Sequence, residues 1–197
     1  MILLLDNYDS FTYNLKQYLE ELSGEAIHVS RNDEISLHEA EIYDSIVFSP
    51  GPGLPQEAGL MMPMIEAFSP DKHLLGICLG HQAITLCYGG RLKNLEKVLH
   101  GVVRPVHIHQ QGHPLLAGVP NPLDTGRYHS WVPDREVFPG ELEVLGSDDD
   151  HEIMILGHKK WSVYGFQFHP ESVLTPAGKQ LLANWLVITG RKPVSLH

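Results

Sequence analysis

The sequence predicts an α/β fold, in which a mostly parallel central sheet carries helices on both faces and a β-rich C-terminal half follows. Two observations support this prediction. Over residues 1–90, short apolar runs alternate with segments whose apolar residues recur at helical spacing. These short runs are continuously apolar, as in parallel strands that are buried on both faces. Beyond residue 91 the chain changes to short β-rich pieces and closes with one helix.

The N-terminal half is expected to form four strand–helix units in succession. The expected strands are Ile2–Leu5, Ile27–Ser30, Ser45–Phe48 and the apolar run that leads into Cys78. The expected helices are Phe11–Leu22, a weakly patterned one at Leu37–Tyr43, Gly59–Phe68 and Ala83–Tyr88. Ligands of such sheets bind at the carboxyl ends of the strands. The loop SPGPGLPQ and the turn at Cys78 both fall at such ends.

The C-terminal half is expected to add several strands and a closing helix. The predicted β-rich pieces are Val98–Ile108, Leu142–Gly146, Ile153–His158 and Val163–Phe168, and the predicted helix is Pro176–Ile188. A length of 197 residues suits one domain, which we place at residues 1–190. The remaining residues, 191–197, are expected to be a loose tail.

Composition excludes some classes of partner. Acidic residues exceed basic ones by 24 to 14, and the net charge of −10 argues against nucleic acid or an anionic membrane surface. The first residues lack a basic region and a cleavage site, and no run approaches the about 20 apolar residues of a membrane span. The chain is therefore expected to be cytoplasmic.

The chain has two cysteines. Cys78 and Cys87 would point to opposite faces of one helical stretch, so no disulfide is expected and Cys87 should fill the core.

The stretch GICLGHQ, residues 76–82, offers a nucleophile at the junction of a strand and a helix. A nucleophile flanked by small residues at such a junction forms a nucleophile elbow, in which a sharp turn raises the middle side chain at the helix N-terminus. Here the nucleophile would be Cys78, between Gly76 and Gly80. A buried cysteine in a glycine-containing turn explains the same pattern equally well, so other residues must decide.

A thiol nucleophile needs a base, and the base needs a group that orients it. The stretch GFQFHPES, residues 165–172, offers both, because His169 directly follows a predicted strand and Glu171 lies two residues on, across a proline that fixes the backbone. His169 would act as general base and later as acid, and Glu171 would hold its tautomer. With 13 histidines in the chain, His169 taken alone would more readily be a surface or cap residue. That plainer interpretation is kept for His28, His38, His73, His107, His109, His113, His151 and His158.

Together these motifs resemble the class I glutamine amidotransferases, a flavodoxin-like α/β family whose glutaminase domains carry a Cys-His-Glu triad. They are most similar to one branch, the glutaminase component of anthranilate synthase and of aminodeoxychorismate synthase. LLLDNYDSFTYNL, SPGPGLPQEAG, GICLGHQ, the pair His100-Gly101, RYHS and GFQFHPES occur in the order typical of that branch. They cover residues 1 to 188, nearly the whole chain.

The resemblance implies a role for each matching residue. Cys78, His169 and Glu171 would be catalytic, and the backbone N–H groups of Gly51 and Leu79 would form the oxyanion hole. Glutamine would be bound by Gly51, Pro52, Gly53, Gln82 and the backbone of Ser130 and Trp131. The family often has HGK and YHSL where this chain has Val102 and Trp131. Neither departure touches the triad, and altered glutamine affinity is the most that we expect from Trp131.

The resemblance also implies partners. L-glutamine would be the substrate, and a chorismate-binding synthase, component I, would receive the ammonia in a hetero-oligomer. No metal or other cofactor is expected in this chain, whereas the partner synthase would depend on Mg²⁺. The segment Asp6–Asn14 is a candidate contact with the synthase. Alternatively, its aromatic residues pack the first helix, with Asp9 or Ser10 as the N-cap.

Three questions stay open at the level of sequence. The product of the partner could be anthranilate, aminodeoxychorismate or both, because that chemistry belongs to the synthase. The chain could instead be an inactive relative that binds glutamine and regulates a partner. It could also be a γ-glutamyl hydrolase or cysteine peptidase of the same fold, which would act on larger amides.

Overall fold

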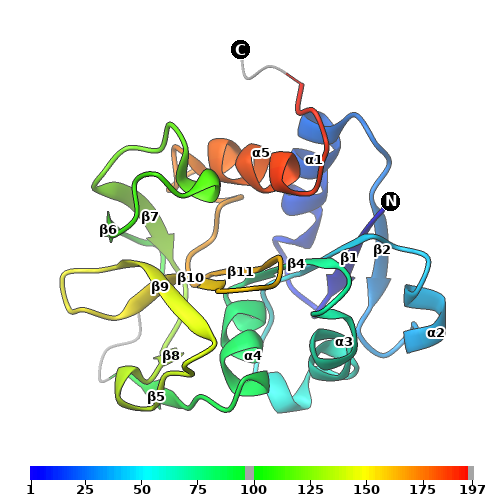
Figure 1. Ribbon diagram of the computed structural model, residues 1–197, viewed down its shortest axis with the longest axis horizontal. Helices are drawn as coiled ribbons and strands as arrows, with labels where there is room; N and C mark the ends of the chain where they lie inside the picture. Colours follow the sequence, from blue (N-terminus) through cyan, green and yellow to red (C-terminus); the bar gives the residue numbers. More distant parts are fainter. Residues whose placement is uncertain (96–99, 195–197) are drawn as a thin grey trace.

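The computed structural model describes residues 1–95 and 100–194, which form a central sheet between two layers of helices (Figure 1). The nine-stranded sheet has the order β2-β1-β3-β4-β11-β10-β9-β6-β7. Its strands are β1 (Ile2–Asp6), β2 (His28–Arg31), β3 (Ser45–Phe48), β4 (His73–Ile77), β6 (Val102–Ile108), β7 (Leu123–Arg127), β9 (Leu142–Ser147), β10 (Ile153–His158) and β11 (Val163–Phe166). A separate two-stranded sheet pairs β5 (Leu92–Asn94) with β8 (Trp131–Pro133).

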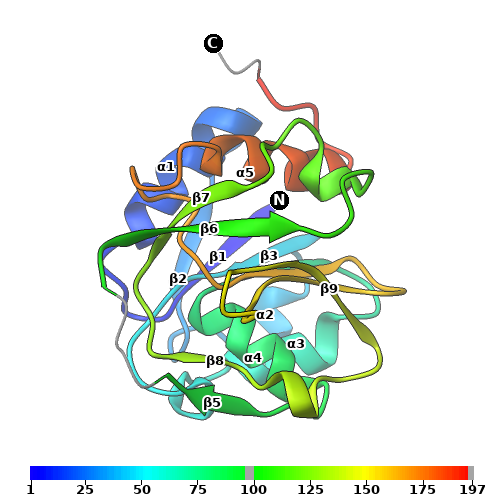
Figure 2. The ribbon, with the colours of Figure 1, turned by 90° about the vertical axis from the view of Figure 1, so that its left-hand side faces the viewer.

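The helices cover both faces of the sheet, as predicted. Figures 1 and 2 both show α1 (Thr12–Ser23) and α5 (Gly178–Ile188) side by side on one face. The opposite face carries α3 (Met61–Phe68) and α4 (Leu79–Cys87), and α2 (Leu37–Ala40) lies near the β2 edge. Short 3-10 turns lie at η1 (Pro55–Glu57), η2 (Pro114–Leu116) and η3 (Arg135–Val137).

Strand β1 shows why continuous apolar runs form the centre of this sheet. Its successive side chains point to opposite faces. Ile2 and Leu4 pack with Leu15 and Leu19 of α1, whereas Leu3 and Leu5 join the cluster that contains α3 and α4 residues. The four apolar side chains of β1, at residues 2–5, are fully buried. A strand segment buried on both faces cannot alternate between apolar and polar residues, so residues 2–5 are all apolar.

The sheet changes from parallel to antiparallel at β11. The pairs from β2 to β4 are parallel, as the repeated strand–helix units predict, and β11 also pairs parallel with β4. From β11 outward, the pairs with β10, β9, β6 and β7 are antiparallel. The mostly parallel core with a β-rich second half is therefore confirmed. The insertion of β11 next to β4 was not predicted, and it brings two distant parts of the chain together.

Several predicted boundaries shift in the structure. Helix α4 begins at Leu79 rather than Ala83, and β11 ends at Phe166 rather than Phe168. Helix α1 begins at Thr12, and its N-cap residue Phe11 has no side-chain cap. The prediction of an Asp9 or Ser10 cap is therefore wrong, although the Asp9 carboxylate accepts the Phe11 N–H at 2.6 Å.

In the second half, β6 begins at Val102, and residues 98–99 of the predicted piece Val98–Ile108 lie outside the described residues. Strands β5, β7 and β8 were not predicted. They are three to five residues long, so their sequences show too little alternation to reveal them.

The predicted loose tail is wrong at its beginning. Arg191 pairs with Glu25 at 3.1 Å and with Asp44 at 2.8 Å, and Asp44 also binds the N-terminal ammonium. The Val194 N–H donates to the Leu22 carbonyl at 2.8 Å. Met1 and Arg191 are thus both held by Asp44, next to the start of β3. The prediction for 195–197 lies outside the described residues.

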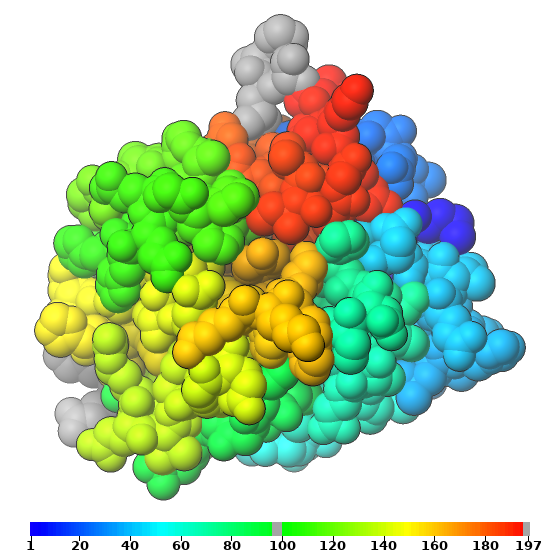
Figure 3. Space-filling model, in the orientation of Figure 1, coloured from blue at the N-terminus to red at the C-terminus, as the bar shows by residue number. Residues whose placement is uncertain are grey.

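The closing helix α5 also fixes the long connection between β6 and β7. The Asn184 side chain donates to the carbonyls of Leu115 and Ala117, each at 2.9 Å. The surfaces of these two segments meet at the top of the space-filling view (Figure 3). Among the helices of residues 1–95 and 100–194, none is both long and apolar enough to cross a membrane.

Two buried histidines make the stability of this fold depend on pH. Burial lowers the pKa of His81 to about 4, and burial together with the Arg127 charge lowers the pKa of His129 to about 3. Both values lie below that of an unfolded histidine, near 6.5, so the folded state binds fewer protons in acid. The stabilisation from the neutral imidazoles is complete above pH 6.5 and is lost as the pH falls from 6.5 to about 4 and then 3.

We therefore expect the free energy of unfolding to fall between pH 7.5 and pH 5, by on the order of 1 to 2 kcal/mol for each histidine. Urea unfolding at the two pH values measures this loss. His129→Gln removes one titrating group and should reduce the difference, whereas His38→Gln at an exposed position should not. An unchanged pH dependence in His129→Gln would contradict the assignment.

Candidate active site

Cys78 occupies the predicted sharp turn between β4 and α4. Its backbone angles are φ 50° and ψ −94°, a left-handed conformation that a residue with a Cβ rarely adopts. The turn is held on both sides, because the Cys78 N–H donates to the Phe166 carbonyl at 2.7 Å and the Gln82 N–H donates to the Cys78 carbonyl at 3.1 Å. The side chain is therefore presented at the first turn of α4, as the elbow pattern predicts.

The glycines on either side of Cys78 are required by space. A Cβ at Gly76 would lie 2.4 Å from the Gly80 backbone, and a Cβ at Gly80 would lie 2.8 Å from the Phe48 carbonyl oxygen. Both distances are shorter than a real Cβ contact. Small residues thus let α4 approach β4 and β3 closely enough for the turn to form.

His169 and Glu171 form a buried pair in the segment that follows β11. His169 Nδ1 lies 2.7 Å from a Glu171 carboxylate oxygen, and both side chains are almost completely buried. Among the described residues, His169 Nε2 has no hydrogen-bond partner, so no bond holds it away from Cys78. Because β11 is parallel to β4, with Phe166 opposite Ile77, the segments after both strands emerge at the same edge of the sheet.

The charges around His169 favour its protonated form. Burial opposes that charge, but the nearby Cys78 sulfur and the hydrogen bond with Glu171 raise the pKa of the imidazole well above its ordinary value. His169 can therefore accept the thiol proton and hold it near neutral pH. This is the behaviour that a general base for a cysteine nucleophile requires.

Aromatic side chains enclose the imidazole. The Tyr128 ring lies 4.8 Å from the His169 ring centroid, and Phe11 meets it edge-on at 5.6 Å. Phe11 and Tyr128 also contact each other, and His100 packs against Tyr128 at 5.3 Å. These contacts limit the rotation of the base. Through Phe11, the N-terminal segment lies directly against the His169 imidazole.

The loop after β3 brings Gly51 next to the start of α4. A Cβ on Gly51 would lie 2.5 Å from the Asn7 carbonyl and 3.0 Å from Leu79 Cδ2. Asn7 fixes this loop further, because its N–H donates to Ser49 Oγ and its side-chain amide donates to the Ser49 carbonyl, both at 2.8 Å. The two residues predicted for the oxyanion hole are thus neighbours in space.

A chain of hydrogen bonds runs from the backbone of Trp131, a predicted glutamine-binding residue, to Cys78. Gln82 Nε2 donates to the Trp131 carbonyl at 2.9 Å and lies 3.4 Å from Gln167 Oε1. Gln167 Nε2 lies 3.7 Å from Cys78 Sγ. The Ser130 carbonyl instead accepts the Leu95 N–H. Gln167 was not predicted as a site residue, although it lies in the same motif as His169.

A model of the glutamine amidotransferase class I family matches residues 3–189 of this chain. The chain belongs to this family. It is 48% identical to anthranilate synthase component 2 of Pseudomonas aeruginosa, over 94% of both chains. It is 43% identical to aminodeoxychorismate synthase component 2 of Escherichia coli, over 94% of this chain and 99% of that protein.

A third relative and a solved structure complete the comparison. Aminodeoxychorismate/anthranilate synthase component 2 of Bacillus subtilis is 42% identical, over 98% of this chain and 99% of that protein. The crystal structure of a protein assigned as a GMP synthase subunit, from Thermoplasma acidophilum, superimposes with a TM-score of 0.85 at 23% identity. The superposition covers 96% of this chain and 93% of the Thermoplasma acidophilum chain. This likeness shows the class I amidotransferase fold.

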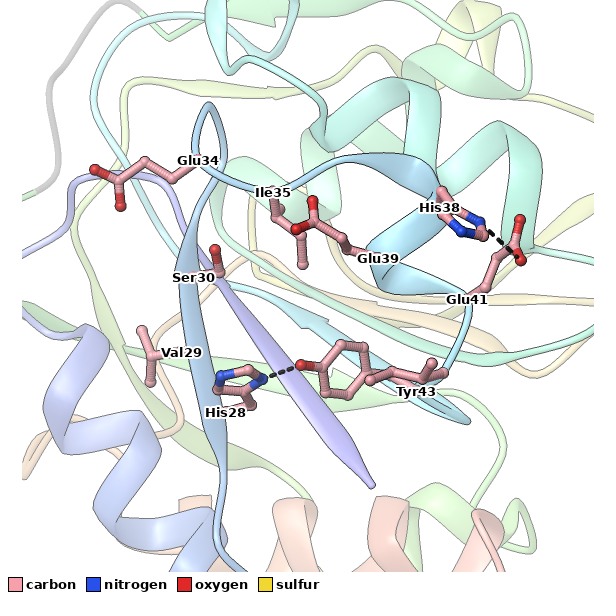
Figure 4. A pocket seen from close by; sticks show the side chains of 10 residues that line it. His28, Val29, Ser30, Glu34, Ile35, His38, Glu39, Glu41 and Tyr43 are labelled. Carbon is pink, nitrogen blue, oxygen red and sulfur yellow. Dashed lines mark hydrogen bonds and ion pairs between the residues drawn. The ribbon is translucent and has the colours of Figure 1, made fainter.

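The amidotransferase has a surface cavity at the β2 edge of the sheet, with a volume of about 500 Å³ (Figure 4). The side chains of His28 and Tyr43 contact each other in its lining through His28 Nδ1 and the Tyr43 hydroxyl, and Ile35 and Glu39 lie on the α2 side. None of the predicted site residues lines this cavity. The described part of the amidotransferase also contains no group of three or more His, Cys, Asp or Glu side chains placed to hold a metal ion.

The remaining histidines that the sequence analysis set aside make ordinary structural contacts where the structure gives them a partner. Examples are the bonds of His73 to Ser162, His107 to Asp149, His109 to Ser147 and His158 to the N–H groups of Lys160 and Trp161. Cys87 lies partly buried with its sulfur 3.7 Å from the Met62 carbonyl, and burial raises its pKa to about 12. It is a poor nucleophile at neutral pH.

The elbow geometry predicts that Gly76→Ala damages the site. The new methyl group would overlap the backbone of α4, so the turn must open, and we expect a loss of stability of about 1 to 3 kcal/mol. Glutaminase activity should fall more than the population of folded protein does, because Cys78 moves with the turn. Urea unfolding and glutamate release, measured on the same preparation, test this. Gly140→Ala is the matched control, since no atom lies within 4 Å of its Cβ position.

Proposed function

We propose that this amidotransferase is the glutaminase component of a synthase that aminates chorismate. It hydrolyses L-glutamine and delivers the ammonia to a chorismate-binding component I. The observation that carries this proposal is the buried His169–Glu171 pair beside the strained Cys78 turn. The component 2 names of relatives that align over nearly their whole length support the choice of partner.

The reaction follows from the positions of the three side chains. Cys78 gives its proton to His169, and the sulfur attacks the side-chain amide carbon of glutamine. The C–N bond then breaks as His169 returns the proton to the leaving nitrogen, which leaves a γ-glutamyl thioester and ammonia. Water, deprotonated by His169, attacks the thioester and releases glutamate and the thiol. Glu171 holds the Nδ1–H throughout, so that Nε2 faces the reacting atoms.

Each attack creates an oxyanion that needs hydrogen-bond donors. Gly51 and Leu79, which lie next to each other, are our candidates for the two backbone N–H groups. Gln82, the backbone of Ser130 and Trp131, and the turn of Gly51, Pro52 and Gly53 are our candidates for glutamine recognition. Every step uses side chains and backbone of this chain, so the proposed chemistry requires no metal or other cofactor.

The relatives do not separate the two possible products. Proteins named for anthranilate synthesis, for aminodeoxychorismate synthesis and for both lie within a narrow range of identity, 42% to 48%. Incubating the chain with its natural synthase, chorismate and glutamine, and identifying the aromatic product, decides between them.

Two alternatives are not favoured. An inactive regulatory relative has no need of a nucleophile, base and orienting carboxylate assembled in one buried site. A γ-glutamyl hydrolase or peptidase would cleave γ-glutamyl peptides in preference to free glutamine. Glutamate release from both substrates distinguishes these functions, and cleavage of the peptides alone would contradict the proposal.

We expect Cys78→Ala to abolish synthesis from glutamine by the assembled complex while synthesis from ammonium salts persists. The reason is that the thiol is used only to release ammonia. Product formation with each nitrogen source measures the two activities. Cys87→Ala, the matched control, should change neither, because Cys87 lies outside the site. Equal loss of both activities in Cys78→Ala would show that this cysteine has a structural role instead.

The N-terminal segment connects the surface to both halves of the site. Phe11 packs against His169, and Asn7 holds the loop that contains Gly51. Between them, Tyr8 is half-exposed with φ 62°, and its hydroxyl donates to the Asp33 carboxylate at 2.8 Å. Tyr13, at the start of α1, is also exposed. A synthase that binds to this segment would act indirectly on His169, through Phe11, and on the loop of Gly51, through Asn7.

We therefore expect the lone chain to be a slow glutaminase that its synthase accelerates. Removal of one oxyanion donor typically costs about 10²- to 10³-fold in rate, so a partner that favours the formed hole can raise turnover by up to that order. Glutamate release by the lone chain and by the complex, with and without chorismate, measures the effect. Tyr8→Ala and Phe11→Ala should reduce the stimulation.

The outcomes separate two parts of this idea. A lone chain that is already as fast as the complex contradicts the coupling itself. Stimulation that survives in folded Tyr8→Ala and Phe11→Ala variants contradicts only the placement of the contact. Tyr18→Ala, in α1 and packed against the core, is the control for a general loss of α1 packing.

A further inference from the structure

One buried side chain beside the nucleophile has no part in the proposed chemistry. Gln167 is fully buried, and its Nε2 lies 3.7 Å from Cys78 Sγ. Its backbone N–H donates to the Met154 carbonyl at 2.9 Å, which continues the pairing of β11 with β10 past Phe166. A buried amide is stable only when its polar atoms have partners. The partners available here are the sulfur and one other amide.

The hydrogen bonds fix which atom of Gln167 faces the sulfur. The Trp131 carbonyl can only accept, so the Gln82 amide must present its NH₂ group to it. The same NH₂ group faces Gln167, which must therefore present its oxygen to Gln82. The NH₂ group of Gln167 is then left to face Cys78. A backbone carbonyl of β8 thus determines, through two amides, that a donor points at the nucleophile.

We propose that Gln167 is a positioning residue, whose N–H group holds the Cys78 thiolate in place and stabilises it. This inference rests on the proposed function in that it takes Cys78 as the nucleophile. A hydrogen bond to the charged form favours the thiolate over the thiol, in addition to the effect of His169. The interaction weakens when the sulfur forms the thioester bond.

The same donor also favours the second half of the reaction. After water attacks the thioester, the C–S bond breaks and its electron pair returns to the sulfur. The N–H group of Gln167 stabilises the departing thiolate, and His169 then supplies its proton. Gln167 therefore acts on both the attack and the departure of the same atom, without contacting the oxyanion.

Alkylation of Cys78 by iodoacetamide at pH 7, without glutamine, tests the proposal. Gln167→Glu keeps the shape but replaces the donor with an oxygen, and Gln167→Met removes all polarity. Since a hydrogen bond to a charged group contributes a factor of about ten or more, both variants should be alkylated at least roughly tenfold more slowly. Cys87 does not interfere, because burial raises its pKa to about 12. Gln180→Glu, at a glutamine in α5 bonded to Asn184, is the matched control.

Gln82→Glu tests the orienting chain itself. The new carboxylate would draw the NH₂ group of Gln167 towards residue 82, which turns the oxygen of Gln167 towards Cys78. Alkylation should then slow although residue 82 is not placed against the sulfur. In the wild-type chain, the side-chain amide resonances of a ¹⁵N-glutamine-labelled sample should include one that shifts when Cys78 is alkylated and is missing in Gln167→Met.

The results distinguish this inference from the proposed function. Folded Gln167 variants that are alkylated at the wild-type rate overturn the inference, and so does a wild-type spectrum in which no such resonance shifts. The spectrum decides the question even where a variant fails to fold. If Cys78→Ala retains glutamine-dependent synthesis, the proposed function itself is wrong.

Discussion

Strand β11 lies parallel to β4, with Phe166 opposite Ile77, and the Phe166 carbonyl accepts the N–H of Cys78. This contact joins parts of the chain that lie almost ninety residues apart. It holds the nucleophile turn from the side of β11, and it starts the segment that carries Gln167 and His169 at the same sheet edge. Without it, the sheet would not hold the elements that carry Cys78 and His169 side by side. The glycines beside Cys78, and Glu171 and the aromatic rings beside His169, then fix the two side chains within the site that this pairing establishes.

The residues around Cys78 hold its backbone in a strained conformation. A residue with a Cβ held at φ 50° costs on the order of 1–3 kcal/mol, and it persists only where the surroundings leave no alternative. Here Gly76 and Gly80 permit backbone contacts that no larger residue could make, and α4 follows at once. The fully buried residues of β4 on one side and of α4 on the other hold the turn between them. Packing therefore supplies the stability that keeps the thiol exposed to the site.

The sequence was sufficient for the parts of the fold that are local. Apolar runs and helical spacing predicted the strands and helices up to α4, because each of those elements is buried in a simple periodic pattern. Motif order predicted that Cys78, His169 and Glu171 act together. Periodicity alone could not show that β11 lies beside β4, since strand order depends on packing between distant segments. Gln167 was missed for a related reason: a glutamine between two phenylalanines gives no sign that its amide faces a sulfur.

The N-terminal segment shows how a surface event could reach the reacting atoms. Asn7 is fixed to Ser49 by two hydrogen bonds, and Phe11 is fixed against His169 and Tyr128. Only three residues separate these anchors, and one of them, Tyr8, has a left-handed backbone and a half-exposed ring. A short strained link between two fixed points cannot absorb a displacement by itself, so movement at Tyr8 must shift one anchor or the other. One anchor packs against His169 and the other against the loop of Gly51, so this segment connects the surface to both halves of the proposed site.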